Sequence, residues 1–216
     1  QEKKELINLN SKIAGIVMAG GLSRRMGENK SKKKFFDYSL IEIVSLRASK
    51  QVEFLCINSN EKLNFSSTKK IEIIPDFFSG NLGPLVGVLS GMKWARKKID
   101  KIKWIVTFPV DCPFFPSNLV CDLLKNSNGN DVVIAKSNSR IHHIVAMWNI
   151  NLESELEDHI RKGTRKIDDF TKKFNTRVVN FSVIGYDPFF NINNLDDYSQ
   201  AKEIYTENFY NNEEFK

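Results

Sequence analysis

Short apolar runs recur along the chain, and their composition predicts strands. The run "KIAGIVMA" (12–19) is nearly continuous and rich in β-branched residues, which is typical of a strand buried on both faces. Similar runs predict strands at 51–58, 70–75 and 101–111, and the last of these ends on an aspartate.

Segments with helical spacing separate these runs. Residues 83–98 carry apolar side chains at i, i+3, i+4 and i+7, and Pro84 stands where a first helical residue tolerates proline. A helix is also expected over 39–50. A third is expected after Ser117, whose hydroxyl would cap a helix carrying Leu119, Val120, Leu123 and Leu124.

The alternation of strands and helices predicts the fold class. It favours an α/β protein with a three-layer, Rossmann-like fold and a mostly parallel sheet. There is no internal repeat and no Pro/Ser-rich linker, so we expect one domain over residues 13–210. Residues 1–12 would be a polar N-terminal extension, and residues 211–216 a polar tail.

The later part of the chain is less regular. It predicts strands at 131–137, 142–149, 177–184 and 189–193, and helices at 151–163, 165–174 and 195–210. Gly163 would stop the first of these helices. We expect these pieces to cover one end of the sheet and to shape a pocket there.

Composition narrows the class of partner. The 216 residues are 41% apolar and carry a net charge of +6, which favours anionic ligands. Three cysteines without metal-ligand spacing indicate reduced thiols and a cytoplasmic protein. No apolar run reaches the roughly 20 residues of a membrane span, and residues 1–12 lack the apolar centre of a signal peptide.

A basic, glycine-rich loop follows the first predicted strand. Gly20 and Gly21 lack Cβ atoms, so backbone N–H groups there can approach a phosphate closely. Arg24, Arg25 and Lys30 add charge-assisted donors, and the loop therefore favours a nucleoside triphosphate. It matches neither a P-loop nor a dinucleotide-binding turn. The lysines at 32–34 are either a solvated loop face or a contact for a second phosphorylated substrate.

Two aspartates follow predicted strands and are candidate metal ligands. Asp111 would lie at the same edge of the sheet as the glycine loop, where its carboxylate could hold Mg²⁺ against phosphate oxygens. The alternative is an aspartate that caps the following turn. Asp76 presents the same two alternatives, and we expect both carboxylates to lie at neighbouring strand ends facing the loop.

Several segments, in matching order, resemble one family. "MAGGLSRRMGENK", "CINSN", "GPLVGVLSGM", "PVDCPFFP" and "FFNINNLDD" are similar to motifs of the molybdenum cofactor guanylyltransferases, and "GTRKIDDF" resembles one branch of that family. The resemblance runs from about Ile13 to about Ala201. It implies a nucleotidyltransferase fold and transfer of GMP from GTP to the phosphate of molybdopterin.

The resemblance also implies roles for individual residues. Those expected to bind the nucleotide are Met18, Ala19, Gly20, Gly21, Lys30, Asn58, Asp76 and Asp111. Lys30, Arg25 and Asp111 would be catalytic, and Asp111 would hold Mg²⁺. Asn191 and Asn193 would lie on the pterin side. Molybdoenzymes or their chaperones are possible further partners; nucleic acid and membrane are not expected.

The sequence departs from the family pattern at a few positions. Asn29 replaces an aspartate, and Cys112 stands where threonine is common. His143 replaces a proline, whereas His142 keeps the matching position and is interpreted as structural. The segment "NNLDD" lacks the usual Thr-Pro, which affects the shape of that loop.

Two other functions remain as alternatives. One is a related cytidylyl- or sugar-phosphate nucleotidyltransferase, against which the Gly-Gly pair is the discriminating feature. The other is a non-catalytic basic binding module. Such a module would not require aspartates at two strand ends, and no aromatic RNA-stacking motif is present.

Overall fold

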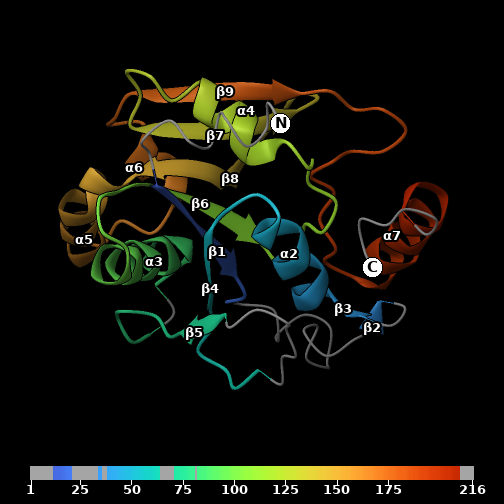
Figure 1. Cartoon of the computed structure of the whole chain (residues 1–216), viewed down its shortest axis with the longest axis horizontal. Helices are drawn as coiled ribbons and strands as arrows, with labels where there is room; N and C mark the ends of the chain where they lie inside the picture. Colours follow the sequence, from blue (N-terminus) through green and yellow to red (C-terminus); the bar gives the residue numbers. More distant parts are fainter. Residues whose placement is uncertain (1–11, 21–33, 36–37, 64–70, 81, 210–216) are drawn as a thin grey trace.

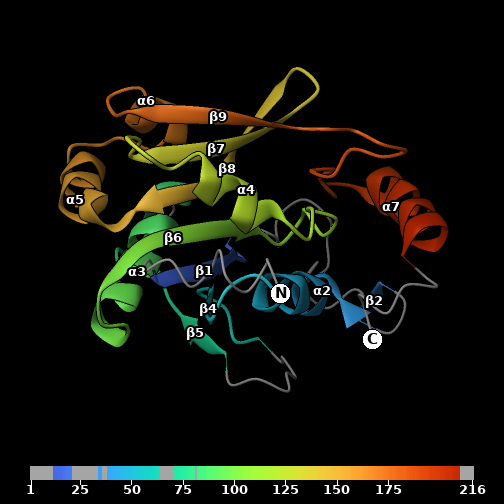
Figure 2. The same cartoon turned by 45° about the horizontal axis from the view of Figure 1, so that its top comes forward.

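A central sheet organises the molecule (Figure 1). The computed structural model describes residues 12–20, 34–35, 38–63, 71–80 and 82–209. Seven strands pair in the order β5-β4-β1-β6-β8-β7-β9 (Figure 2). Their bounds are β1 Lys12–Met18, β4 Phe54–Asn58, β5 Glu72–Ile74, β6 Ile102–Pro109, β7 Val132–Ser137, β8 Arg140–Asn149 and β9 Thr176–Phe181.

The sheet is mostly parallel, as predicted. β8 is antiparallel to both of its neighbours, β6 and β7, whereas the pairings of β1 with β4 and β6, of β4 with β5 and of β7 with β9 are parallel. A separate short hairpin joins β2 (Lys34–Phe35) to β3 (Tyr38–Ser39). Ser39 then begins the next helix with a capping box formed with Glu42.

Helices cover both faces of the sheet and make the three layers expected from the sequence. One face carries α2 (Leu40–Ser49), α4 (Leu119–Lys125) and α7 (Leu195–Asn208). The other carries α3 (Pro84–Lys98), α5 (Glu153–Arg161) and α6 (Ile167–Thr171), with a short 3-10 helix, η2 (Ile150–Leu152), leading into α5. None of the helices in the described part of the chain is long and apolar enough to cross a bilayer.

β1 shows why the strand runs are continuously apolar. Ile13 and Val17 belong to the core under α2, whereas Ala14, Ile16 and Met18 belong to the core under α3. Side chains of a strand alternate between faces, so a strand covered on both sides must be apolar at every position.

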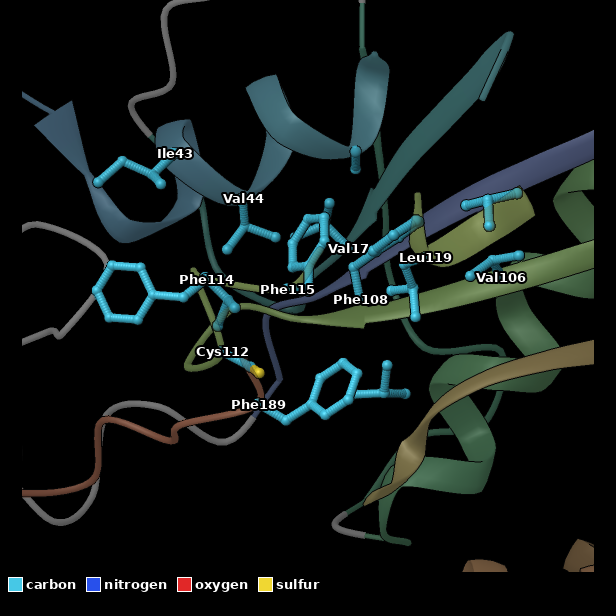
Figure 3. Close-up of a cluster of buried hydrophobic side chains, with 14 of the residues drawn as sticks. Val17, Ile43, Val44, Val106, Phe108, Cys112, Phe114, Phe115, Leu119 and Phe189 are labelled. Atoms are coloured by element: carbon cyan, nitrogen blue, oxygen red, sulfur yellow. The ribbon is translucent and has the colours of Figure 1, made fainter. Parts of the chain in front are cut away.

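Aromatic side chains fill the core on the α2 side. Figure 3 shows Phe108 and Phe115 next to Val44 of α2, with Phe114 beside the turn after β6 and Phe189 near Cys112. These four rings are at most 1% exposed. Phe189 comes from the last third of the chain, so this cluster ties that part to β6 and the turn after it.

Several details differ from the sequence predictions, and the helix expected over 165–174 spans only Ile167–Thr171. Residues 189–193 form no strand. Asn118, not Ser117, precedes α4, and its side chain makes no capping bond. The strand expected over 177–184 ends at Phe181, and β7, β8 and β9 extend the sheet instead of covering its end. The predicted stop at Gly163 is confirmed: this residue has φ +95° and its N–H donates to Ile160 O.

The three cysteines form no disulfide, in agreement with the prediction of reduced thiols. Burial is the main cause that raises the pKa of the Cys56 and Cys112 thiols well above the ordinary value. Both thiols therefore stay protonated at neutral pH and act as small apolar side chains.

Candidate functional site

Backbone hydrogen bonds align the ends of three central strands. Ala19 N–H donates to Asn58 O at 3.0 Å, and Val110 N–H donates to Met18 O at 3.2 Å. Gly20 follows this alignment directly and is exposed. The structure thus brings Gly20, Asn58 and Asp111 to one edge, which we call the carboxyl edge of the sheet and which is the usual place for ligands in α/β folds.

Asn58 and Asp76 form a hydrogen-bonded pair at this edge. Asn58 Nδ2 donates to Asp76 Oδ1 at 3.0 Å, and Asn60 Nδ2 donates to Asp76 Oδ2 at 2.8 Å. Asp76 N–H in turn donates to Asn60 Oδ1 at 2.8 Å. Both carboxylate oxygens of Asp76 therefore accept amide hydrogens, and the two asparagines are fixed in orientation.

Gly87 allows helix α3 to pack directly against the side chain of Asn58. A Cβ at Gly87 would lie 2.4 Å from Asn58 Oδ1 and 2.4 Å from Met18 Cε. Helix α3 can approach the ends of β1 and β4 only because this position has no side chain. Gly87, the last residue of "GPLVG", therefore lets α3 pack closely enough to bury Asn58.

The expected placement of Asp76 and Asp111 at neighbouring strand ends is wrong. Asp76 follows β5 and Asp111 follows β6, and both β4 and β1 stand between those strands. Three interstrand spacings amount to roughly 14 Å, which is too far for one metal ion to join the two carboxylates. The sequence showed which residues end strands but not the order of the strands.

The described residues include no cluster of three or more His, Cys, Asp or Glu side chains suited to a metal ion. Asp111 is partly exposed, and its carbonyl oxygen accepts the N–H of Ile192 at 2.8 Å. Mg²⁺ is commonly held by one or two carboxylates together with substrate phosphates and water. The chemistry of Asp111 thus fits a metal that is bound together with a triphosphate.

A pocket opens where β8 separates from β6. The two strands pair only as far as Thr107 and Ala146, and Thr107 Oγ1 donates to Ile144 O at 2.5 Å. Opposite β7, the register of β8 jumps, because Ile134 pairs with Ala146 whereas Ala135 pairs with His142. Residues 143–145 are therefore a bulge that bends β8 away, and Pro109 has no N–H to continue the pairing.

This split-sheet pocket has a volume of about 400 Å³. The residues that line it come from the starts of α3, α6 and β8, from the end of β6, and from two later loops. They are Pro84, Pro109, Arg140, Ile141, His142, His143, Ile144, Val145, Arg165, Lys166, Ile167, Asp168 and Asn191. Sequence reasoning had named only Asn191 of these as a site residue.

Positive charge dominates the polar part of the lining. Arg140, Arg165 and Lys166 are cationic, whereas Asp168 is paired with Lys172 at 2.5 Å. That hydrogen bond is the main cause that lowers the pKa of Asp168. The pocket therefore suits an anion.

The start of α3 adds to this character. Its N-cap, Gly83, offers no side chain, and its first turn has no acidic residue, so no carboxylate offsets the positive end of the helix dipole there. Gly83 has φ +85°, and a Cβ there would lie 3.0 Å from Arg165 O. This glycine lets the start of α3 lie against the loop that carries Arg165.

The two asparagines expected on the pterin side differ in their surroundings. Asn191 lines the split-sheet pocket, and its neighbour Ile192 is bonded to Asp111. Asn193 is exposed, and its N–H donates to Asp197 Oδ2 at 2.7 Å at the start of α7. The described geometry places Asn191 in the pocket lining and Asn193 outside it.

The remaining predicted residues divide into two groups. Gly21, Arg25 and Lys30 lie outside the described residues. Met18 and Ala19 lie at the end of β1 with side chains only 7% and 9% exposed. Contacts from these two residues to a ligand would therefore involve mainly the backbone.

The turn after β1, the acidic residue after β6 and the cationic pocket beside it fit one class of protein, the nucleotidyltransferases. Residues 15–177 match the family model described as "MobA-like NTP transferase domain". The chain belongs to this family.

Curated relatives are similar over most of their length. The molybdenum cofactor guanylyltransferase of Rhodopseudomonas palustris (strain BisB5) is 33% identical over 193 residues, covering 88% of this chain and 92% of that protein. That of Rhizobium leguminosarum bv. trifolii (strain WSM2304) is 35% identical over 199 residues, covering 89% and 92%.

Solved structures share the fold. Molybdopterin-guanine dinucleotide biosynthesis protein A from Archaeoglobus fulgidus has a TM-score of 0.70 and 26% identity, covering 90% of this chain and 99% of that one. A 4-diphosphocytidyl-2C-methyl-D-erythritol synthase from Anaerococcus prevotii has a TM-score of 0.66 at 14% identity, covering 91% and 99%. The second likeness concerns the fold alone.

Proposed function

We propose that the protein transfers GMP from GTP to the terminal phosphate of molybdopterin. The names of the relatives support this substrate pair. The observation that carries the proposal is the cationic split-sheet pocket beside Asp111. Pro109 lines the pocket two residues before Asp111, and Asn191 lines it next to the residue bonded to Asp111.

In this proposal the two substrates meet at the end of β6. GTP lies along the carboxyl edge, over Gly20 and beside Asn58. The phosphate of molybdopterin enters the split-sheet pocket, where Arg140, Arg165 and Lys166 offset its charge. Asp111 lies between the two sites and is the residue that would hold Mg²⁺, which would neutralise charge on the triphosphate.

The chemistry is an in-line displacement. An oxygen of the acceptor phosphate forms a bond to the α-phosphorus of GTP, the bond from that phosphorus to the bridging oxygen breaks, and pyrophosphate leaves. The attacking oxygen is already anionic, so no strong general base is needed. The protein contributes positioning and charge neutralisation, with Lys30 and Arg25 expected to add to the latter.

A nucleotide panel tests the proposal. The full chain is incubated with Mg²⁺, molybdopterin and GTP, CTP, ATP or UTP in turn, and the dinucleotide product and pyrophosphate are quantified. We expect GTP to be preferred. A preference for CTP would indicate a cytidylyltransferase instead, and absence of transfer from every nucleotide would favour the binding-module alternative. Delivery to molybdoenzymes or their chaperones, and a cytoplasmic location, remain predictions.

A further inference from the structure

Three polar side chains form a chain of hydrogen bonds that begins at His142, one of the residues lining the split-sheet pocket. His142 Nε2 lies 2.7 Å from Ser137 Oγ, and Ser137 Oγ donates to Asp187 Oδ1 at 2.7 Å. Ser137 is fully buried and His142 is 6% exposed. The three come from the end of β7, the start of β8 and a later loop, and we call them the His142 relay.

The relay has a defined direction. A serine hydroxyl has a single hydrogen, and a carboxylate can only accept. Because Ser137 donates to Asp187, it must accept from His142, so Nε2 of the imidazole carries the hydrogen. Burial is the main cause that lowers the pKa of His142, with Arg140 and His143 acting in the same direction and Asp187 opposing them. At neutral pH the ring is therefore the uncharged Nε2–H tautomer.

The far end of the relay holds a segment of the proposed active site. Asp187 Oδ1 also accepts the N–H of Phe189 at 2.9 Å, which starts a tight turn. The ring of Phe189 packs on that of His142, with centroids 4.8 Å apart. Beyond it, Asn191 lines the split-sheet pocket and Ile192 N–H donates to Asp111 O.

We propose that His142 is a positioning residue for the acceptor substrate. Acting through Ser137 and Asp187, it fixes segment 187–192 so that Asn191 faces the pocket at a set distance from Asp111. This inference rests on the proposed function, because the acceptor is the substrate expected in the pocket. The carboxyl edge, with Gly20, Asn58 and Asp76, takes no part in the relay.

Kinetics of paired variants test this role. Ser137→Ala and His142→Phe remove one hydroxyl or one ring donor, and we expect each to raise the KM for molybdopterin about tenfold while the Kd for GTP stays unchanged. His142→Gln keeps an N–H near the position of Nε2 and should restore most of the native KM. His159→Gln, which changes a histidine outside the relay, and Ser139→Ala are the matched controls.

A KM for molybdopterin that is unchanged in folded His142→Phe and Ser137→Ala variants would overturn the proposal. So would equal weakening of GTP and molybdopterin, which a general loss of structure would produce. Failure of His142→Gln to differ from His142→Phe would also argue against a donor at Nε2.

A measurement without substrates separates this proposal from the function it rests on. In the native protein, nitrogen NMR shifts of the labelled imidazole should show Nε2 protonated and Nδ1 unprotonated at pH 7, and Ser137→Ala should change them. An Nδ1–H tautomer would overturn the relay whatever the protein transfers. A native protein that forms no guanylyl product, yet shows the expected tautomer, would contradict the proposed function and leave the relay intact.

Discussion

Asn58 and Asp76 hold each other at the carboxyl edge, with Nδ2 of the first 3.0 Å from Oδ1 of the second. Asn58 is 2% exposed, and the close packing of α3 at Gly87 leaves its side chain no room to move. The pair joins the end of β4 to the segment after β5, next to the turn that carries Gly20.

Removing Asn58 tests this junction. We expect Asn58→Ala to lower the free energy of unfolding by about 1–3 kcal/mol, because the buried edge loses its donor to Asp76. GTP affinity should fall as well. Urea denaturation and GTP titration measure the two effects. Asn60→Ala, which removes a more exposed donor to the same carboxylate, is the comparison and should cost less stability; the reverse order would contradict the assignment.

Gly87→Ala tests the close approach of α3. The added Cβ would collide with Asn58 Oδ1 and Met18 Cε, so we expect a loss of about 1–3 kcal/mol despite the better helix propensity of alanine. GTP affinity should drop along with stability, because Asn58 is displaced. Calorimetry and nucleotide binding measure both. A variant as stable as the native protein would show that the helix can shift freely.

Gly20→Ala separates folding from nucleotide choice. No described atom lies within 4 Å of a Cβ at Gly20, so stability should change by less than about 0.5 kcal/mol. We expect the variant to lose GTP use more than CTP use, because a purine needs more room than a pyrimidine over this turn. Competition kinetics with both nucleotides give the ratio. An unchanged ratio would rule out loop volume as the basis of the preference.

Asp111→Asn tests the metal assignment. We expect transfer to fall by several kcal/mol of transition-state stabilisation, at least about a hundredfold, while the fold is retained. The apparent affinity for Mg²⁺ in the presence of GTP should also fall. Asp100→Asn, in the exposed turn after α3, is the control. Near-native turnover by a folded Asp111→Asn variant would remove this residue from the metal site.

The buried histidine predicts a pH dependence of stability. The pKa of His142 is lowered in the folded protein, so the unfolded chain takes up its proton first as the pH falls. This residue's contribution is therefore full above about pH 6.5, the ordinary histidine value, and is lost progressively below it. Thermal unfolding from pH 7.5 to 5 should show a smaller loss for His142→Gln than for the native protein. Parallel curves would mean that His142 does not titrate differently in the two states.

Sequence periodicity was sufficient for the layers and for most elements. β1 and α3 follow directly from their apolar spacing. β1 is covered on both faces and is apolar from Ile13 onward, whereas α3 buries one face and is apolar at helical intervals. The segment 189–193 was wrongly predicted as a strand, because its apolar and polar residues alternate for a reason other than strand geometry. Phe189 and Ile192 point into the core from a turn begun by Asp187, a contact that no local pattern reveals.

The carboxyl edge of the sheet was more predictable than the split-sheet pocket. The glycine turn can be recognised from one short segment of sequence, and so can each residue that ends a strand. The split-sheet pocket instead depends on a register jump between β7 and β8, and on a loop that returns from residue 165. The His142 relay joins Ser137 to a partner 50 positions away. Such pairings are set by strand order and register, which the sequence leaves open.

The reversed direction of β8 has a consequence for how specificity can change. Because β8 runs against its neighbours, its first residues reach the same edge as the last residues of β6. In the proposed function, the nucleotide and the acceptor would therefore lie on opposite sides of β6. The hairpin that joins β7 to β8 can therefore be lengthened, shortened or recharged without altering the turn after β1. Exchange of residues 137–145 between relatives should transfer preference for the acceptor while leaving the choice of nucleotide with the recipient.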